Sequence, residues 1–123
     1  IGYMQHIHET QARVKQAHGK VLGCPVVSIG SETCTCSEQQ AVGEKIREMF
    51  LRKRRYYESA IRDAIAEGSL EPGDPAVKAQ ALTSLIEGTI TQARILNDPE
   101  IFRELPELAL RVLGAKSLAL AKA

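Results

Sequence analysis

The sequence predicts an all-α domain, and three observations support that prediction. Apolar residues recur at three- and four-residue steps along most of the chain, whereas no stretch of useful length alternates like a strand. Glycine, proline and asparagine residues separate the helical stretches at positions typical of helix ends. The chain has 123 residues, the size of one ordinary domain. We therefore expect a single domain over residues 1–123.

Two helices are expected in the first third of the chain. The first covers residues 1–22 and is followed by Gly23 as a stop signal. Its apolar residues near one face are Tyr3, Ile7, Val14, Ala17 and Val21. A short second helix is expected to begin at Pro25, because proline suits the first helical position. Gly30 and the β-branched residues around it weaken this second helix.

The longest helix is expected from Ser37 to Gly68. Ser37 and Gln40 form a capping-box pattern at its start, and Gly68 marks its end. The apolar positions at helical spacing are Val42, Ile46, Met49, Phe50, Tyr57, Ala60, Ile61 and Ala64. A rod of roughly 45 Å with one apolar stripe must be covered by other elements.

Two cap-and-proline signals divide the last third. Asp74 followed by Pro75 predicts the start of a fourth helix that runs to about Asn97. The sequence Asn97-Asp98-Pro99 repeats this cap-and-proline signal, and Pro106 divides the residues that follow into two helices. We expect a helix of one or two turns from Pro99 and a last helix from Pro106 into residues 113–123.

Composition excludes several classes of function. The formal net charge is +1, so the chain has no global field to attract nucleic acid or anionic lipid. No window is apolar enough for a membrane span, and no motif of an enzyme active site is present. We expect neither catalysis nor a cofactor. The run 52–55 is basic, but four consecutive helical residues point all ways round and form no groove-facing patch.

The three cysteines, Cys24, Cys34 and Cys36, favour a reducing compartment. An odd number, with two of them only two residues apart, does not form the framework of a secreted disulfide protein. We expect a cytoplasmic protein. The Cys-x-Cys pair lacks the spacing of a zinc site, so no metal is expected, whereas redox sensing by these thiols stays open.

The order of the sequence motifs resembles that of the C-terminal domain of TetR-family transcriptional regulators. After the long helix, the motifs are Gly68-x-Leu70, Asp74-Pro75, Leu85-Ile86-Glu87-Gly88, Asn97-Asp98-Pro99 and Leu105-Pro106-Glu107-Leu108. Before the long helix, Gly23-Cys24-Pro25 opens the expected short second helix. The resemblance covers nearly the whole chain. It implies a ligand-binding and dimerisation domain of a repressor, released from DNA when a small-molecule effector binds.

The resemblance also implies an N-terminal helix-turn-helix domain that would contact operator DNA. Because the chain begins at Ile1 rather than methionine, we expect it to be part of a longer polypeptide that supplies this domain. No residue of the present chain is assigned to DNA.

The fourth and last helices carry more apolar surface than a small domain needs, which predicts a homodimer with a four-helix interface. Gly88 lies inside the fourth helix, where glycine is unfavourable unless another backbone comes close. The expected interface residues are Gly88, Gln92, Ile95, Leu105, Leu108, Ala109 and Val112.

A ligand pocket is expected between the first three helices and the first half of the fourth. Its candidate residues are Tyr3, Met4, Ile7, His8, Gln11, Ile29, Phe50, Lys53, Tyr57, Leu82 and Ile86. Each has an alternative role in ordinary core packing. Lys53 would bind an acidic effector if it points inward, or form a salt bridge or remain exposed otherwise. The alternative function for the whole chain is a homodimeric helical scaffold without an internal ligand.

Overall fold

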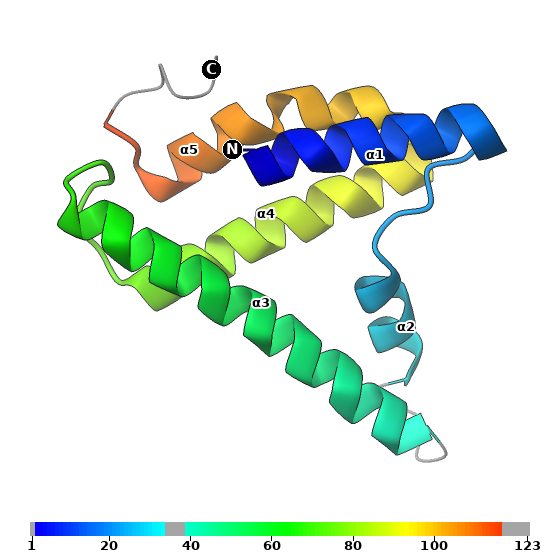
Figure 1. Ribbon diagram of the computed structural model, residues 1–123, viewed down its shortest axis with the longest axis horizontal. Coiled ribbons are helices and arrows are strands. Elements are labelled where there is room, and N and C mark those ends of the chain that lie inside the picture. Colours follow the sequence, from blue (N-terminus) through cyan, green and yellow to red (C-terminus); the bar gives the residue numbers. More distant parts are fainter. Residues whose placement is uncertain (1, 34–38, 117–123) are drawn as a thin grey trace.

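The computed structural model describes residues 2–33 and 39–116, and within them the chain is all-α as predicted (Figure 1). The elements in chain order are α1 (Gly2–His18), α2 (Pro25–Thr33), α3 (Gln40–Ala66), α4 (Pro75–Leu96), the 3₁₀ helix η2 (Pro99–Glu104) and α5 (Leu105–Leu113). No helix among these residues is long and apolar enough to cross a membrane.

Helix α4 is the centre of the arrangement. It packs against α3 on one side and against η2 and α5 on the other, and α1 lies along η2 (Figure 1). Helix α2 packs on the N-terminal half of α3. There a Cβ on Gly30 would lie 2.9 Å from the Ile46 side chain, so the absence of a side chain permits the contact.

The hydrophobic core forms around the inward face of α4. The buried residues of that face recur at three- and four-residue steps: Ala79, Leu82, Ile86, Ile90 and Ala93. Phe102, Leu105 and Ile86 are the largest fully buried side chains. Met4 and Ile7 of α1 and Tyr57 and Ile61 of α3 complete the cluster. The core therefore joins α1, α3, α4, η2 and α5.

The first helix is shorter than predicted. It ends at His18, not at Leu22, because Gly19 adopts a left-handed φ of 74° and terminates it. Gly23 has a φ of 81° but belongs to the connection that leads into α2. The predicted start of α2 at Pro25 is confirmed.

The described part of the long helix is α3, from Gln40 to Ala66. Ser37, predicted as its cap, lies outside the described residues, and Gln39 at the N-cap position makes no side-chain cap bond. At the other end Gly68 takes the left-handed conformation with φ 79°, one residue past the C-cap Glu67. The predicted stop at this glycine is confirmed.

Both cap-and-proline signals are confirmed. The Asp74 side chain accepts a hydrogen bond from the Ala76 amide at 2.8 Å, with Pro75 in the first turn of α4. Asp98 does the same for the Glu100 amide at 3.0 Å and opens η2. Acceptors at these positions satisfy amide groups that a helix leaves free.

The last helix is shorter than predicted. Helix α5 ends at Leu113, because Gly114 takes a left-handed φ of 71° and its amide turns back to the Arg111 carbonyl. The chain then pairs with the α3–α4 connection, where the Glu71 amide donates to the Gly114 carbonyl at 2.8 Å. Residues 117–123 lie outside the described part.

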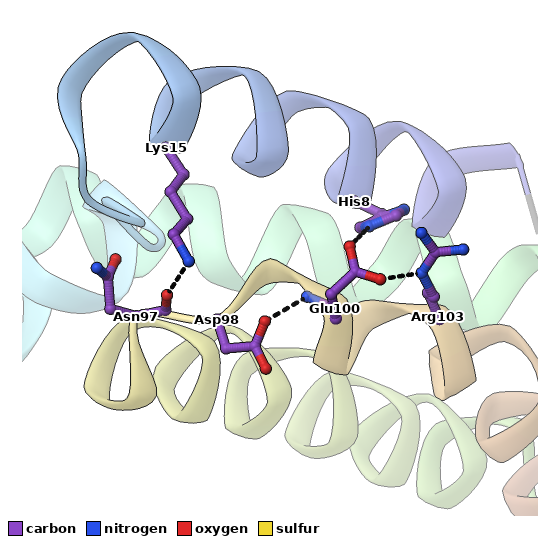
Figure 2. A network of polar contacts seen from close by, with 6 residues as sticks. All are labelled: His8, Lys15, Asn97, Asp98, Glu100 and Arg103. Carbon is purple, nitrogen blue, oxygen red and sulfur yellow. Dashed lines mark hydrogen bonds and ion pairs between the residues drawn. The ribbon is translucent and has the colours of Figure 1, made fainter.

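Asn97 fastens the end of α1 to the end of α4 (Figure 2). Its side chain accepts from the Val21 amide at 2.9 Å and donates to the Gly19 carbonyl at 3.0 Å. The Lys15 ammonium donates to the Asn97 carbonyl at 2.6 Å. Asn97 itself has a left-handed φ of 52°, a conformation that asparagine tolerates better than most residues.

Replacing Asn97 with alanine is expected to lower the free energy of unfolding by about 2 kcal/mol. The change removes two side-chain hydrogen bonds and places a less tolerant residue at a positive φ. Urea denaturation measures it. Asn97→Gly is the matched control, because glycine adopts this φ without strain and loses only the side-chain bonds. A larger loss for glycine than for alanine would contradict the backbone part of the explanation.

Candidate functional site

A mostly buried ion pair joins α3 to α4. The Lys53 ammonium contacts the Glu87 carboxylate through Oε1, and the two side chains are 23% and 12% exposed. The pair forms because α3 and α4 pack against each other and bring these positions together. Lys53 also lies 5.2 Å from the centroid of the Phe50 ring, one turn earlier on α3. The salt-bridge alternative for Lys53 is therefore the one observed, and its charge is already paired.

Two oxygen atoms beside this pair are buried without a partner. They are Oε2 of Glu87 and the hydroxyl of Tyr57. Tyr57 lies one turn after Lys53 on α3 and is buried. Burial raises the pKa of Tyr57 far above its usual value, and Tyr3, Glu87 and Cys24 act in the same direction. The hydroxyl therefore keeps its proton at physiological pH and can donate as well as accept a hydrogen bond.

Aromatic rings surround the Tyr57 ring. Tyr3 of α1 and Tyr56 each lie 6.3 Å from it between ring centroids, in tilted and edge-on orientations. Tyr3 is half exposed, so its ring lies between the buried Tyr57 ring and solvent. We name Phe50, Lys53, Tyr57 and Glu87 the polar cluster.

A cleft of about 440 Å³ opens between α2 and the second half of α4, and no residue of the polar cluster lines it. It is lined by Gly23, Cys24, Val27, Ser28, Ser31, Glu32, Ile90, Thr91, Arg94 and Ile95. The Arg94 guanidinium donates to the Ser28 hydroxyl at 2.7 Å and bridges the two helices. The volume is within the range of small-molecule sites, and apolar walls with a few polar groups are typical of them.

Cys24 lines the cleft, and it is one of the groups that raise the pKa of Tyr57. On α4, Glu87, Ile90 and Arg94 follow one another at three- and four-residue steps, so they share one flank of the helix. Ile90 and Arg94 line the cleft, whereas Glu87 does not.

The predicted ligand residues divide into two groups. Met4, Ile7, Tyr57, Leu82 and Ile86 are brought together in the core. Phe50 and Lys53 belong to the polar cluster, and Tyr3 contacts Tyr57.

The other predicted ligand residues lie elsewhere. His8 lies 3.5 Å from Glu100 of η2 (Figure 2), and Ile29 is exposed. The Gln11 side chain is bonded to the backbone of Gly23, with both contacts at 3.4 Å. The cleft, moreover, lies against the second half of α4, not its first half as expected.

None of the residues that line the cleft was among the ligand candidates from the sequence, and neither was Glu87; the missed cleft residues include Cys24, Ser28 and Arg94. Glu87 and Arg94 carried a usable signal, because they stand on one flank of α4 with the apolar Ile90 between them. A charge on a flank next to an apolar stripe is often paired across a helix interface. Ser28 and Cys24 carried no such signal.

The described residues contain no group of three or more His, Cys, Asp or Glu side chains that could hold a metal ion. Cys24 is a free thiol, half buried at the cleft. Cys34 and Cys36 lie outside the described residues.

The face of α4 that points away from the core carries no charged residue. Its members recur at helical spacing: Val77, Ala81, Ser84, Gly88, Gln92 and Ile95. Ile95 is 75% exposed, and a Cβ built on Gly88 would meet nothing within 4 Å. No backbone in the described part of the chain therefore accounts for the glycine.

Helix α5, which packs against α4, carries two further exposed apolar side chains, Leu108 and Val112, which are 41% and 46% exposed. Leu105 and Ala109, predicted with them for a subunit contact, are instead 0% and 1% exposed. They face η2 and α4 because the amphipathic stripe of this short helix is needed to close the chain's own core. We name Gly88, Gln92, Ile95, Leu108 and Val112 the outer apolar face.

Comparison with known proteins identifies the family. The sequence model described as "Tetracyclin repressor-like, C-terminal domain" matches residues 5–107. Searches of the curated proteins and of the solved structures gave no match. The matched range includes the polar cluster, the cleft and most of α5, and domains of this family belong to transcription regulators. The chain therefore belongs to the family of C-terminal domains of TetR-like transcriptional regulators.

Proposed function

We propose that this chain senses a small-molecule effector and dimerises, so that effector binding relieves DNA binding by a TetR-like repressor. The observation that carries the proposal is the cleft of about 440 Å³ between α2 and α4 inside a domain of this family. Its volume and its mixture of apolar walls with a few polar groups suit a small molecule.

The outer apolar face supports the dimer part of the proposal. It is uncharged and exposed on a single chain, and two copies of α4 and α5 related by a two-fold axis would cover it. Gly88 would allow a partner helix to approach closely, because no described residue lies within 4 Å of a Cβ built there. Leu105 and Ala109 support this face from within the core.

Operator DNA would be contacted by a helix-turn-helix domain outside residues 1–123, in the cytoplasm. The two helix-turn-helix domains of a dimer must match DNA half-sites about 34 Å apart, so a small relative rotation of the subunits weakens DNA binding. A helical scaffold without an effector is less well supported, because a filled interior would leave neither the cleft nor the buried polar atoms.

A thermal-shift screen of the protein against a chemically diverse small-molecule library tests effector sensing. We expect at least one compound to raise the melting temperature with increasing concentration, because a ligand that binds only the folded state stabilises it. Tyr57→Ala should weaken that compound at least about tenfold, since Tyr57 is a predicted effector residue whose ring is buried beside Tyr3 of α1.

Unchanged affinity in Tyr57→Ala would remove Tyr57 from the site. A library without any stabilising compound would favour the scaffold. The matched control is Tyr56→Ala, because Tyr56 is the adjacent residue of α3 but is exposed. Its affinity for the same compound should equal that of the unaltered protein.

A further inference from the structure

The cleft between α2 and α4 contains a positive charge without an acidic partner, and the inference drawn from it rests on the proposed sensing function. Arg94 lines the cleft, and its guanidinium forms no ion pair with any residue in the described part of the chain. Its hydrogen bond to the Ser28 hydroxyl at 2.7 Å goes to an uncharged group. The charge of Arg94 is therefore available to a molecule in the cleft.

The Arg94 side chain is held in place at both of its ends. A Cβ on Gly23 would lie 3.1 Å from Cδ of Arg94, so the aliphatic stem packs directly against the glycine backbone. Ser28 holds the guanidinium through Nη1. A guanidinium carries five N–H donors in a planar fork, and the bond to Ser28 uses one of them. A carboxylate is the group whose two oxygens match such a fork.

The first turn of α2 lies at the same end of the cleft as Arg94. Gly23 and Cys24 line the cleft immediately before Pro25, the first residue of α2. The N-terminal end of a helix carries a partial positive charge, which favours a nearby anion. The backbone of α2 and the guanidinium of Arg94 therefore favour the same sign of charge in a ligand.

The opposite end of the cleft is acidic. Glu32 lines the cleft from the last turn of α2, four residues after Ser28, which corresponds to about 6 Å along the helix axis. A second anionic group of a ligand would meet this like charge. The walls between the two ends include the apolar side chains of Val27, Ile90 and Ile95. These walls suit an apolar body that carries its charge at one end only.

We propose that the effector is a monocarboxylate with a compact apolar body. Its carboxylate accepts hydrogen bonds from the Arg94 guanidinium beside Ser28, at the end of the cleft where α2 begins. Its body lies against Val27 and Ile90, and Glu32 disfavours a second negative charge at the far end.

Isothermal titration at neutral pH with three probes that share one body tests this inference. The probes are para-butylbenzoate, which is an anion, para-butylbenzamide, which is uncharged, and para-butylbenzylamine, which is a cation. The benzoate is expected to bind at least about tenfold tighter than the amide, because only the benzoate forms charge-assisted hydrogen bonds with Arg94. The amine is expected to bind more weakly than the benzoate, since it would meet the like charge of Arg94.

Arg94→Gln should lower the benzoate-to-amide affinity ratio to about one, because glutamine can still contact Ser28 but carries no charge. Arg62→Gln is the matched control: Arg62 forms an ion pair with Glu58 on α3, away from the cleft lining, and the ratio should stay unchanged. Glu32→Gln removes the acidic group, so the ratio should stay the same or rise. Arg94 and Glu32 are exposed, so the variants should keep the fold, and circular dichroism checks this.

Four results would overturn the inference. They are an amide that binds as tightly as the benzoate, an amine that binds more tightly than the benzoate, no binding by any of the three probes, and a ratio that Arg94→Gln leaves unchanged. The second result would assign the cleft to a cation held by Glu32. These results are separable from the failure of sensing itself. If another compound of the thermal-shift library stabilises the protein, the sensing function stands and only the ligand class is wrong.

Discussion

Replacing Leu108 and Val112 with glutamate is expected to yield single chains in place of a dimer. Both side chains are 41–46% exposed and lie on the outer apolar face, so the change puts two charges per chain into the proposed four-helix contact. A two-fold axis brings like charges together, and charges without partners are costly to bury. Light scattering should report 13.5 kDa, the mass of one chain, instead of twice that value.

The fold of the single chain should survive this double substitution, because neither side chain is part of the buried core. Circular dichroism checks this, and a persistent dimer with native helicity would refute the assignment of the outer apolar face. Ser59→Glu on the exposed side of α3 is the control and should remain dimeric.

Gly88→Leu gives an independent test of the same face. A Cβ built here meets nothing within 4 Å among the described residues outside its own turn of helix, and leucine is a better helix former than glycine. The single chain should therefore tolerate the change, whereas the partner helix would be pushed away. Sedimentation at a series of concentrations should show a dissociation constant at least about a hundredfold higher. An unchanged constant would place the subunit contact elsewhere.

The second large effect is expected for Lys53→Met, which should lower the free energy of unfolding by about 3 kcal/mol. The variant leaves Glu87 as a carboxylate that is only 12% exposed and has lost the partner of Oε1, while Oε2 has none already. Urea denaturation at neutral pH measures the loss. The Lys53 stem itself is replaced by a side chain of similar length, so packing changes little.

The double variant Lys53→Met with Glu87→Leu should recover most of this loss, because it removes the stranded charge and fills the space with an apolar side chain. Lys45→Met is the matched control, since the Lys45–Glu48 pair is exposed and should contribute less than about 1 kcal/mol. If the double variant were as unstable as the single one, the loss would come from packing and not from charge.

Local signals were sufficient for most of the fold. Asp74 with Pro75, and Asp98 with Pro99, act within a few residues of the amides that they satisfy, so their role is legible in the sequence. The helices between them follow the spacing of apolar residues. The helix ends at Gly19 and Gly114 were missed, because a glycine terminates a helix only where the chain that follows finds other contacts. After α5, the Gly114 carbonyl accepts a hydrogen bond from the Glu71 amide, which lies 43 positions earlier in the sequence.

The candidate site was predicted only in part, for a similar reason. Tyr57 and Phe50 fall on the apolar stripe of α3, which local spacing reveals. The partner of Lys53 is Glu87, 34 positions later, and no local pattern pairs them. Leu105 was expected at a subunit contact because spacing shows which residues share a stripe, but not whether that stripe meets the same chain or another.

The hydrogen bonds around Asn97 fix the C-terminal end of α1 relative to α4. They hold the helix at Lys15 and the following turn, whereas its opposite end carries Tyr3 against the ring of Tyr57. Tyr3 stands about 18 Å along the helix from Lys15, so a tilt of about 10° shifts it by about 3 Å. Because Met4 and Ile7 at the same end of α1 lie in the core, a displacement at Tyr57 that tilted α1 would also shift its packing on η2.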